Sequence, residues 1–143
     1  MEKMKLKIKK LNKDAVIPNY AHPGDAGLDL YSLEDYTLAP SEQRTFFIGF
    51  ALEFPFGYVA LVKDKGGVAK AGVHTLGGVY DTGYRGEYNV TLINLSKDDY
   101  NIKKGNKIAQ LVILPMAQGE MEITDQLSTT ARGEGRFGST GKK

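Results

Sequence analysis

Asp81 is the acidic residue whose surroundings in the sequence most favour chemistry. It opens the turn Asp81–Gly83 within the glycine-rich stretch Gly77–Asn94, and Tyr84 and Arg85 follow just beyond it. Bare glycine backbone lets a flat ligand approach closely, and a turn held between two strands keeps its side chains at fixed distances. An ordinary hairpin capped by a solvated aspartate would give the same local pattern, so by itself the turn is only a candidate site.

A second acid, Asp29, lies between Leu28 and Leu30 in a short apolar segment. An unpaired carboxylate inside a β-sheet would be costly, so we expect Asp29 to have a partner. That partner is a backbone cap, a basic residue or a metal ion. The local sequence favours neither a structural nor a functional role.

The rest of the inventory excludes several chemistries. The chain has two histidines, His22 and His74, and no cysteine, which leaves no zinc tetrad and no disulfide. It contains neither a G-x-x-x-x-G-K-[ST] phosphate loop nor a G-x-S-x-G nucleophile elbow. Carboxylates bind hard cations, while backbone N–H groups, lysine and arginine bind phosphate oxygens. The acids, glycine-rich loops and scattered basic residues that remain therefore suit a phosphate-bearing ligand with a divalent cation.

The length of 143 residues predicts one domain, and 41% apolar with 25% charged residues is ordinary for a globular protein. A net charge of +2 is too small to indicate a nucleic-acid partner. No apolar run approaches the roughly 18 residues that span a membrane, and the positively charged N-terminus lacks the apolar core of a secretory signal. The absence of cysteine fits a reducing compartment, so we expect a cytoplasmic protein without membrane or nucleic-acid partners.

Short strands must position these residues, because the chain shows no long helical period. Apolar, β-branched or alternating segments occur at Lys5–Lys9, Leu28–Tyr31, Arg44–Leu52, Tyr58–Val62, Ile108–Leu114 and Glu120–Thr124. The stretch Gly77–Asn94 is predicted to be a β-hairpin with strands Val79–Tyr80 and Tyr88–Ile93, and one helical turn is expected around Val68–Lys70. This pattern predicts an all-β barrel or sandwich.

The C-terminal end differs in composition from the rest. Residues 129–143 are polar and rich in glycine, which is typical of a flexible tail. We therefore expect a single β-barrel domain over residues 1–130 and a glycine-rich segment over residues 131–143.

Five segments resemble, in order, the five motifs of the trimeric deoxyuridine triphosphate nucleotidohydrolase (dUTPase) family. They are Ala26–Leu30, Lys65–Ala69, Gly78–Glu87, Gly105–Leu111 and Arg132–Gly141. The third and fifth are long and specific, and the resemblance extends from about Ala21 to Gly141. It implies a jelly-roll-like β-barrel that forms a homotrimer, with each site built from three subunits. It also implies hydrolysis of dUTP to dUMP and pyrophosphate with Mg²⁺.

The resemblance implies roles for individual residues. Asp81 matches the general base that deprotonates the water attacking the α-phosphorus, and Tyr84 matches the tyrosine under the deoxyribose, where a ribose 2′-hydroxyl would collide. The backbone flanking Val79 and near Asn89 would bind the uracil edge, and Asp29 matches an acid near the water shell of the magnesium ion. The substrate-binding residues implied in this way are Lys65, Gly66, Gly67, Gly78, Val79, Tyr84, Asn89, Gln110, Arg132, Phe137, Gly138, Ser139 and Thr140.

The tail that composition marks as flexible would then be a lid. Gln110 matches a phosphate contact, Arg132, Ser139 and Thr140 match phosphate ligands of the tail, and Phe137 matches the aromatic ring that covers the base. Closure of such a segment over the substrate excludes water from the site.

Three departures from the family pattern stand out. Lys65-Gly66 replaces a usual Arg-Ser, so the bidentate guanidinium and a hydroxyl near the scissile bridging oxygen are both missing. Asn106-Lys107 replaces a common Asp-Arg, and Arg136 replaces a glycine before the aromatic residue of the tail. None of these changes affects Asp81 or Tyr84.

Two other functions remain open at this point. A dCTP deaminase has a similar fold but uses a glutamate base with a serine and an arginine in the second motif, and Gly66 removes the serine. A non-catalytic nucleotide-binding protein on the same scaffold is the other alternative. Release of pyrophosphate, release of ammonia and absence of turnover distinguish the three.

Overall fold

The structure is a computed structural model that describes residues 3–142, with eleven strands and one short helix in that range. The elements are β1 (Lys7–Lys10), β2 (Gly27–Tyr31), β3 (Tyr36–Leu38), β4 (Gln43–Phe47), β5 (Phe50–Glu53), β6 (Tyr58–Lys63), α1 (Gly66–Lys70), β7 (Val73–Leu76), β8 (Val79–Tyr80), β9 (Asn89–Asn94), β10 (Tyr100–Ile102) and β11 (Lys107–Pro115).

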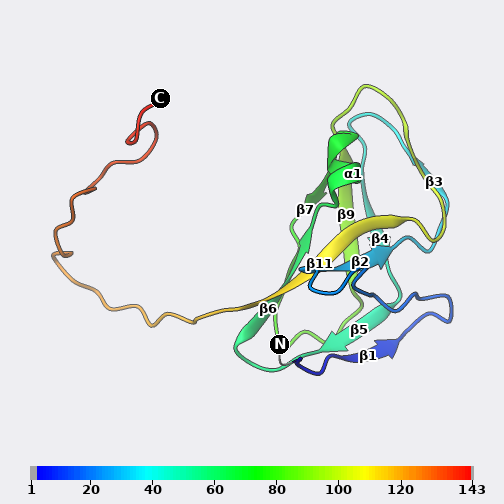
Figure 1. The fold of residues 1–143 in the computed structure, drawn as a ribbon, viewed down its shortest axis with the longest axis horizontal. Coiled ribbons are helices and arrows are strands. Elements are labelled where there is room, and N and C mark those ends of the chain that lie inside the picture. The colour runs from blue at the N-terminus through cyan, green and yellow to red at the C-terminus, as the bar shows by residue number, and fades with distance from the viewer. Residues whose placement is uncertain (1–2, 143) are drawn as a thin grey trace.

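The strands form an all-β body, as the strand pattern predicts, and it is jelly-roll-like, as the family resemblance implies (Figure 1). One sheet has the order β2-β11-β6-β8, a second has the order β4-β9-β7, and two pairs, β1-β5 and β10-β3, complete the set. Every pairing is antiparallel. The single helical turn expected around Val68 is α1, and no helix within residues 3–142 could span a membrane.

The core lies between these sheets and is filled from alternating positions. In β9, for example, Val90 and Leu92 are buried while Asn89, Thr91 and Ile93 are partly exposed. The aromatic residues Phe46, Phe50 and Tyr88 are almost fully buried beside them. Burial of a side chain of this size stabilises a fold by about 1.5–3 kcal/mol, so the core fixes the strands that border the site.

The segment Arg44–Leu52, predicted as one strand, is two strands that belong to different sheets. The break is at Gly49, whose φ of +82° is a left-handed conformation that favours glycine. A Cβ atom there would also lie 2.9–3.0 Å from the side chains of Leu33, Ala15 and Asn12. The chain therefore turns at Gly49, so β4 pairs with β9 and β5 pairs with β1.

Both strands of the predicted hairpin Gly77–Asn94 form, but the prediction that they pair with each other is wrong. Within residues 3–142, β8 and β9 share no backbone pair: β8 pairs with β6, whereas β9 lies between β4 and β7. Because both edges of β9 are occupied, β8 finds its partner in the other sheet. The pattern also gave no sign of the short strands β3, β7 and β10.

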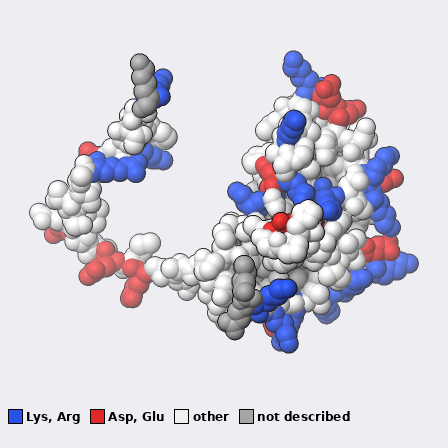
Figure 2. Space-filling model, in the orientation of Figure 1, with Lys and Arg blue, Asp and Glu red and all other residues white. Residues whose placement is uncertain are grey.

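After Pro115 the chain leaves the body as an extended segment, residues 117–142, which we call the tail (Figure 1). The alternating segment Glu120–Thr124 is not a strand, because it pairs with no other segment of residues 3–142, and Met121 and Ile123 are 93% and 99% exposed. In the described chain no hydrogen bond or ion pair joins the tail to the body. Acidic residues gather in its first part and basic residues near its end (Figure 2).

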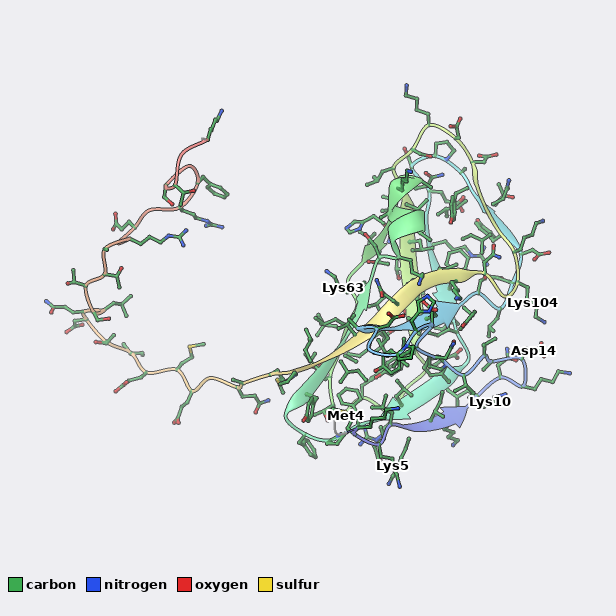
Figure 3. The ribbon with its side chains drawn as sticks, in the orientation of Figure 1. Met4, Lys5, Lys10, Asp14, Lys63 and Lys104 are labelled. Atoms are coloured by element: carbon green, nitrogen blue, oxygen red, sulfur yellow. The ribbon has the colours of Figure 1, made fainter. Side chains whose placement is uncertain are left out.

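Charged side chains cover the outer surface of the body, where several form exposed ion pairs. Asp14 and Lys104 are one such pair, with Oδ2 and Nζ 3.2 Å apart and both side chains about half exposed (Figure 3). Pairs of this kind contribute little to stability in water.

Candidate functional site

A pocket of about 280 Å³ lies between β8 and the ends of β7 and β9. Its lining contains three of the predicted site residues, Gly78, Val79 and Asn89, together with Val62, Leu76, Gly77, Tyr80 and Thr91. Small-molecule sites usually occupy about 300–1,000 Å³, so this pocket suits one planar ring rather than a whole nucleotide. Gly78 has a φ of +94°, and its C=O accepts a hydrogen bond of 2.8 Å from the N–H of Val62, which closes one wall.

Tyr80 joins the two sides of this pocket through its hydroxyl group. Tyr80 Oη donates to the C=O of Asn89 and accepts from the N–H of Asn89, with both distances 2.8 Å. Burial raises the pKa of Tyr80, so the hydroxyl keeps the proton it donates. The backbone N–H and C=O of Asn89 are therefore both hydrogen-bonded within the protein. Among the described residues, the side-chain amide of Asn89 makes no hydrogen bond and is its free polar group.

The turn after β8 holds Asp81 and Tyr84. The N–H of Tyr84 donates to the C=O of Asp81 at 3.1 Å, and Thr82 Oγ1 donates to the C=O of Phe54 at 3.0 Å, which fixes the turn to the body. The Asp81 carboxylate is exposed and, within residues 3–142, makes no hydrogen bond or ion pair. It is thus free to bind a water molecule. The Tyr84 ring, 40% exposed, lies 5.6 Å from the Tyr80 ring between centroids.

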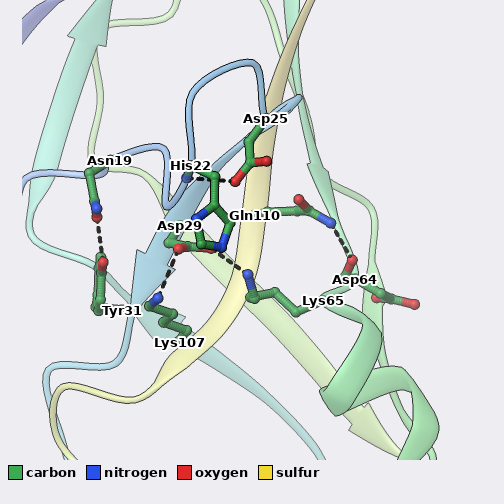
Figure 4. Close-up of polar contacts among 9 residues, drawn as sticks. All are labelled: Asn19, His22, Asp25, Asp29, Tyr31, Asp64, Lys65, Lys107 and Gln110. Carbon is green, nitrogen blue, oxygen red and sulfur yellow. Dashed lines mark hydrogen bonds and ion pairs between the residues drawn. The ribbon is translucent and has the colours of Figure 1, made fainter.

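Asp29 has two lysine partners, which answers the question its buried position raises (Figure 4). Lys65 Nζ donates to Asp29 Oδ1 at 2.5 Å, and Lys107 Nζ lies 3.2 Å from Oδ2 without the geometry of a hydrogen bond. Burial by itself raises the pKa of Asp29, but the contacts and charges of the two lysines outweigh it and hold the pKa below its usual value. Asp29 is therefore a carboxylate at neutral pH.

The strand register places Gln110 beside Asp29 and its two lysine partners. It is opposite Asp29 in β2 and opposite Lys63 in β6, so β11 places it in the middle of three strands. Gln110 Nε2 donates to the C=O of Asp64 at 2.8 Å, and the side chain lies so close over Gly27 that a Cβ atom there would be 2.0 Å from Oε1. We call Asp29, Asp64, Lys65, Lys107 and Gln110 the Asp29 cluster.

Asp64 anchors the outer part of the Asp29 cluster to β7. The N–H of Thr75 donates to Asp64 Oδ1 at 2.7 Å, and His74 Nδ1 lies 2.5 Å from Asp64 Oδ2. Burial raises the pKa of Asp64, while the hydrogen bonds from Thr75 and His74 lower it further than burial raises it. β7, which the sequence pattern missed, thus supports the loop that carries Lys65.

Gly66 and Gly67 form the first turn of α1, directly after Lys65. Neither has a positive φ, and a Cβ atom added at either position would meet nothing within 4 Å. A side chain would therefore fit at either position, so the fold does not require glycine there, and the bare backbone leaves room for a ligand.

The five predicted site residues of the tail lie apart from the body in this structure. Phe137 is 91% exposed, with the guanidinium of Arg136 4.6 Å from its ring centroid. Arg132 Nε donates to the C=O of Gly135 at 2.8 Å, so the tail forms local turns of its own. The remaining three, Gly138, Ser139 and Thr140, are exposed as well.

The structure thus brings the predicted residues together in three places: the pocket with its turn, the Asp29 cluster with α1, and the tail. Sequence reasoning missed Tyr80 and Lys107 as contributors. Lys107 stands in a segment that was singled out as a motif, and a cation near a buried acid is a signal that could have found it. Nothing in the sequence indicates the hydrogen bonds of Tyr80, because they join β8 to β9, and these two strands are not paired with each other.

The fit of a magnesium ion depends on Asp29, the predicted acid. Among residues 3–142 no group of three or more His, Cys, Asp or Glu side chains could bind a metal ion. Asp29 has a lysine at each oxygen, so it suits contact with a metal-bound water and not direct coordination. Mg²⁺ commonly keeps several waters and binds through one or two carboxylates and substrate phosphates, and these residues fit that arrangement.

Comparison with known proteins identifies the family. A sequence model described as dUTPase matches residues 13–141. The deoxyuridine 5′-triphosphate nucleotidohydrolase of Nautilia profundicola is 47% identical over 97% of this chain and 100% of its own length. That of Clostridioides difficile is 45% identical over 95% of this chain and 97% of its own. This chain therefore belongs to the dUTPase family.

Solved structures agree with this assignment. The dUTPase of Staphylococcus bacteriophage 80alpha, solved with dUpNHpp, has a TM-score of 0.90 and 30% identity, covering 96% of this chain and 98% of that one. A dUTPase from phage phi11 of S. aureus, whose structure shows the coordination of a structural Mg(II) ion, has a TM-score of 0.81 and 26% identity, with 87% and 99% covered.

Proposed function

We propose that this chain hydrolyses dUTP to dUMP and pyrophosphate with Mg²⁺. The observation that carries the proposal is the pocket sized for one ring, with the Asp81 carboxylate, which is unpaired within residues 3–142, in the turn that adjoins it. Membership of the dUTPase family and the dUTP analogue bound by the phage 80alpha enzyme support the substrate. Deamination of dCTP has no observation in its favour, and nucleotide binding without turnover rests only on the missing hydroxyl at Gly66.

In this proposal the pocket binds uracil and the turn binds the sugar and the reacting water. Backbone groups flanking Val79 and the Asn89 side-chain amide hydrogen-bond the base, and the Tyr84 ring lies under the deoxyribose. Asp81 takes the proton of the water that attacks the α-phosphorus. General-base catalysis requires that the carboxylate be free to accept this proton, and Asp81 has no competing partner in the described chain.

The triphosphate would lie along the Asp29 cluster and α1. Lys65 and Gln110 are the side chains available for phosphate oxygens, with the open backbone of Gly66 and Gly67 beside them. Mg²⁺ bound to the phosphates would neutralise charge that builds on them during the reaction. Asp29 would contact a water of that ion, since both of its oxygens already lie beside a lysine.

In this proposal residues 1–130 are the barrel domain, and residues 131–143, the end of the tail, are the lid that closes the site. Arg132, Ser139 and Thr140 bind phosphates, Gly138 allows their approach, and Phe137 covers the base. An exposed phenylalanine and an unattached tail are expected of a segment that binds only with substrate. A homotrimer in which three subunits contribute to each site, located in the cytoplasm, completes the proposal.

A pyrophosphate-release assay on a panel of dUTP, dCTP, dTTP and UTP tests the function. We expect fast release from dUTP alone among these four. UTP should be far slower, because its 2′-hydroxyl would collide with the Tyr84 ring. Ammonia from dCTP would establish the deaminase instead. Binding of dUTP without release of either product would establish the non-catalytic alternative.

A further inference from the structure

We infer that Tyr80 is a positioning residue that sets the width of the base pocket and so its selectivity between uracil and thymine. The pocket lies where β8 and β9 face each other, and within residues 3–142 these strands share no backbone pair. Their spacing must therefore be fixed by something other than a ladder of peptide hydrogen bonds. The inference rests on the proposed function of this pocket.

The Tyr80 hydroxyl is the group that fixes this spacing. It hydrogen-bonds both the N–H and the C=O of Asn89 at 2.8 Å, and in the described chain no other hydrogen bond joins β8 to β9. A donor and an acceptor from one residue hold a single oxygen atom more firmly than either would alone. Tyr80 thus takes the place of a missing rung between the two strands.

The Tyr80 ring is itself held by the core. It stacks on Tyr88 with centroids 3.9 Å apart and planes 11° apart, and it is only 8% exposed. Tyr88 is fully buried, its N–H donates to the C=O of Phe50 at 2.8 Å, and its C=O accepts from the N–H of Ile48 at 3.1 Å. The core therefore fixes Tyr88, Tyr88 fixes Tyr80, and Tyr80 fixes the distance from Val79 to Asn89.

This distance matters for base selection. Val79 and Asn89 line the pocket from its two strands, and thymine differs from uracil by one methyl group on the ring edge. A rigid pocket excludes that methyl group by contact, whereas a pocket that can widen admits it. The centroid of the Tyr84 ring lies 5.6 Å from that of the Tyr80 ring. Tyr80 therefore supports both the base pocket and the tyrosine under the sugar.

The test compares Tyr80→Phe with Tyr88→Phe in the full-length chain. Tyr80→Phe keeps the stacked ring and removes both hydrogen bonds to Asn89. Tyr88→Phe is the matched control, because the Tyr88 hydroxyl is buried and has no hydrogen-bond partner among the described residues. The probes are dUMP and dTMP, with the two dissociation constants measured by calorimetry. Hydrogen exchange at the Asn89 amide, followed by NMR, is measured in the same samples.

We expect wild type and Tyr88→Phe to prefer dUMP by the same factor and to protect the Asn89 amide from exchange. Tyr80→Phe should lose about tenfold of that preference, which is about 1.4 kcal/mol in the relative binding free energy of the two nucleotides, and should expose the amide. A structural role alone would lower the melting temperature while leaving the ratio of the two dissociation constants unchanged.

Several results would overturn the inference: an unprotected Asn89 amide in wild type, no preference for dUMP in wild type, or an unchanged preference in Tyr80→Phe. The two wild-type measurements can overturn the inference even if Tyr80→Phe does not fold. Loss of the preference in Tyr80→Phe supports the inference even if the wild-type protein hydrolyses no dUTP, in which case the proposed function alone is wrong.

Discussion

Asp81 has a role that can be separated from folding, because its carboxylate is exposed and makes no hydrogen bond or ion pair in the described chain. We expect Asp81→Asn to reduce the turnover of dUTP by about 10²–10⁴-fold, the usual contribution of a general base. The melting temperature and the affinity for dUTP should remain close to those of wild type. Steady-state pyrophosphate release with a thermal melt of each protein measures both. Turnover within a few-fold of wild type would rule out Asp81 as the base.

Asp29, unlike Asp81, contributes to folding stability, because its carboxylate is buried and paired with two lysines. Its pKa is lower in the folded protein than in the unfolded chain, where a model aspartate has a pKa of about 3.9. The ion pairs therefore stabilise the fold fully above that value, and the contribution is lost as pH falls through the folded pKa. We expect Asp29→Asn to lower the free energy of unfolding at pH 7 by about 1–3 kcal/mol.

Urea denaturation of wild type and Asp29→Asn from pH 7 down to about pH 2 tests this. The difference between them should shrink as the solution is acidified. Asp14→Asn is the matched control, because Asp14 and Lys104 form an exposed pair and its loss should change stability little. A difference between wild type and Asp29→Asn that is independent of pH would contradict the ion-pair explanation.

For individual residues, the sequence predicts contacts between near neighbours in the chain but not contacts between distant segments. Asp81 and Tyr84 belong to one turn, so their spacing along the chain predicted their proximity. The partners of Asp29 come from α1's N-terminal edge and from β11, and only strand register brings Lys65 and Lys107 to it. Local spacing could therefore predict that Asp29 has a partner, but not which one.

Among the elements, α1 offers the clearest test of the departure at Gly66. Gly66 is in the first turn of the helix, lacks a positive φ and has open space around a Cβ atom, so serine fits there. Gly66→Ser should raise the single-turnover rate more than it changes affinity, because a hydroxyl donor aimed at developing charge can contribute up to about 3–4 kcal/mol, and less in a partly solvated site.

Gly66→Ala is the control, since it adds a Cβ atom without a hydroxyl and should leave the single-turnover rate unchanged. Circular dichroism establishes that the three proteins are equally folded. If a folded Gly66→Ser protein is no faster than Gly66→Ala, another group already fills the place of the hydroxyl, and Lys65 is the first candidate.

The strand pattern predicted most elements and failed where pairing partners decide the outcome. Apolar and β-branched composition located β2, β6 and β11, because each of these strands buries apolar side chains. It could not predict that β8 and β9 join different sheets, since both have the composition of hairpin strands. Glu120–Thr124 failed for a related reason: alternation makes a strand only where an edge is available to pair with it.

For the whole molecule, the tail is the part whose removal should leave a folded protein. Deletion of Ala131–Lys143 should lower dUTP turnover strongly while the melting temperature stays near that of wild type, because in residues 117–142 no hydrogen bond or ion pair reaches the body. Phe137→Ala should reproduce part of the loss, about 1–3 kcal/mol by analogy with other base–aromatic contacts.

Met121→Ala is the control for Phe137→Ala, because both residues are exposed apolar side chains of the tail and only Phe137 matches a substrate contact. Turnover, melting temperature and sedimentation of each variant give the comparison. Full activity in the truncated protein would show that the tail has no part in the reaction.

The central position of β11 has a consequence for how the chain is made. β11 lies between β2 and β6 and is the last strand in the sequence. The ribosome therefore releases β2 and β6 long before it makes the strand that both require. Sheets closed by such distant segments fold slowly, on a scale of about milliseconds to seconds. Until Pro115 is made, two apolar strands lack their shared partner, and this is the interval in which the nascent chain is most exposed to aggregation.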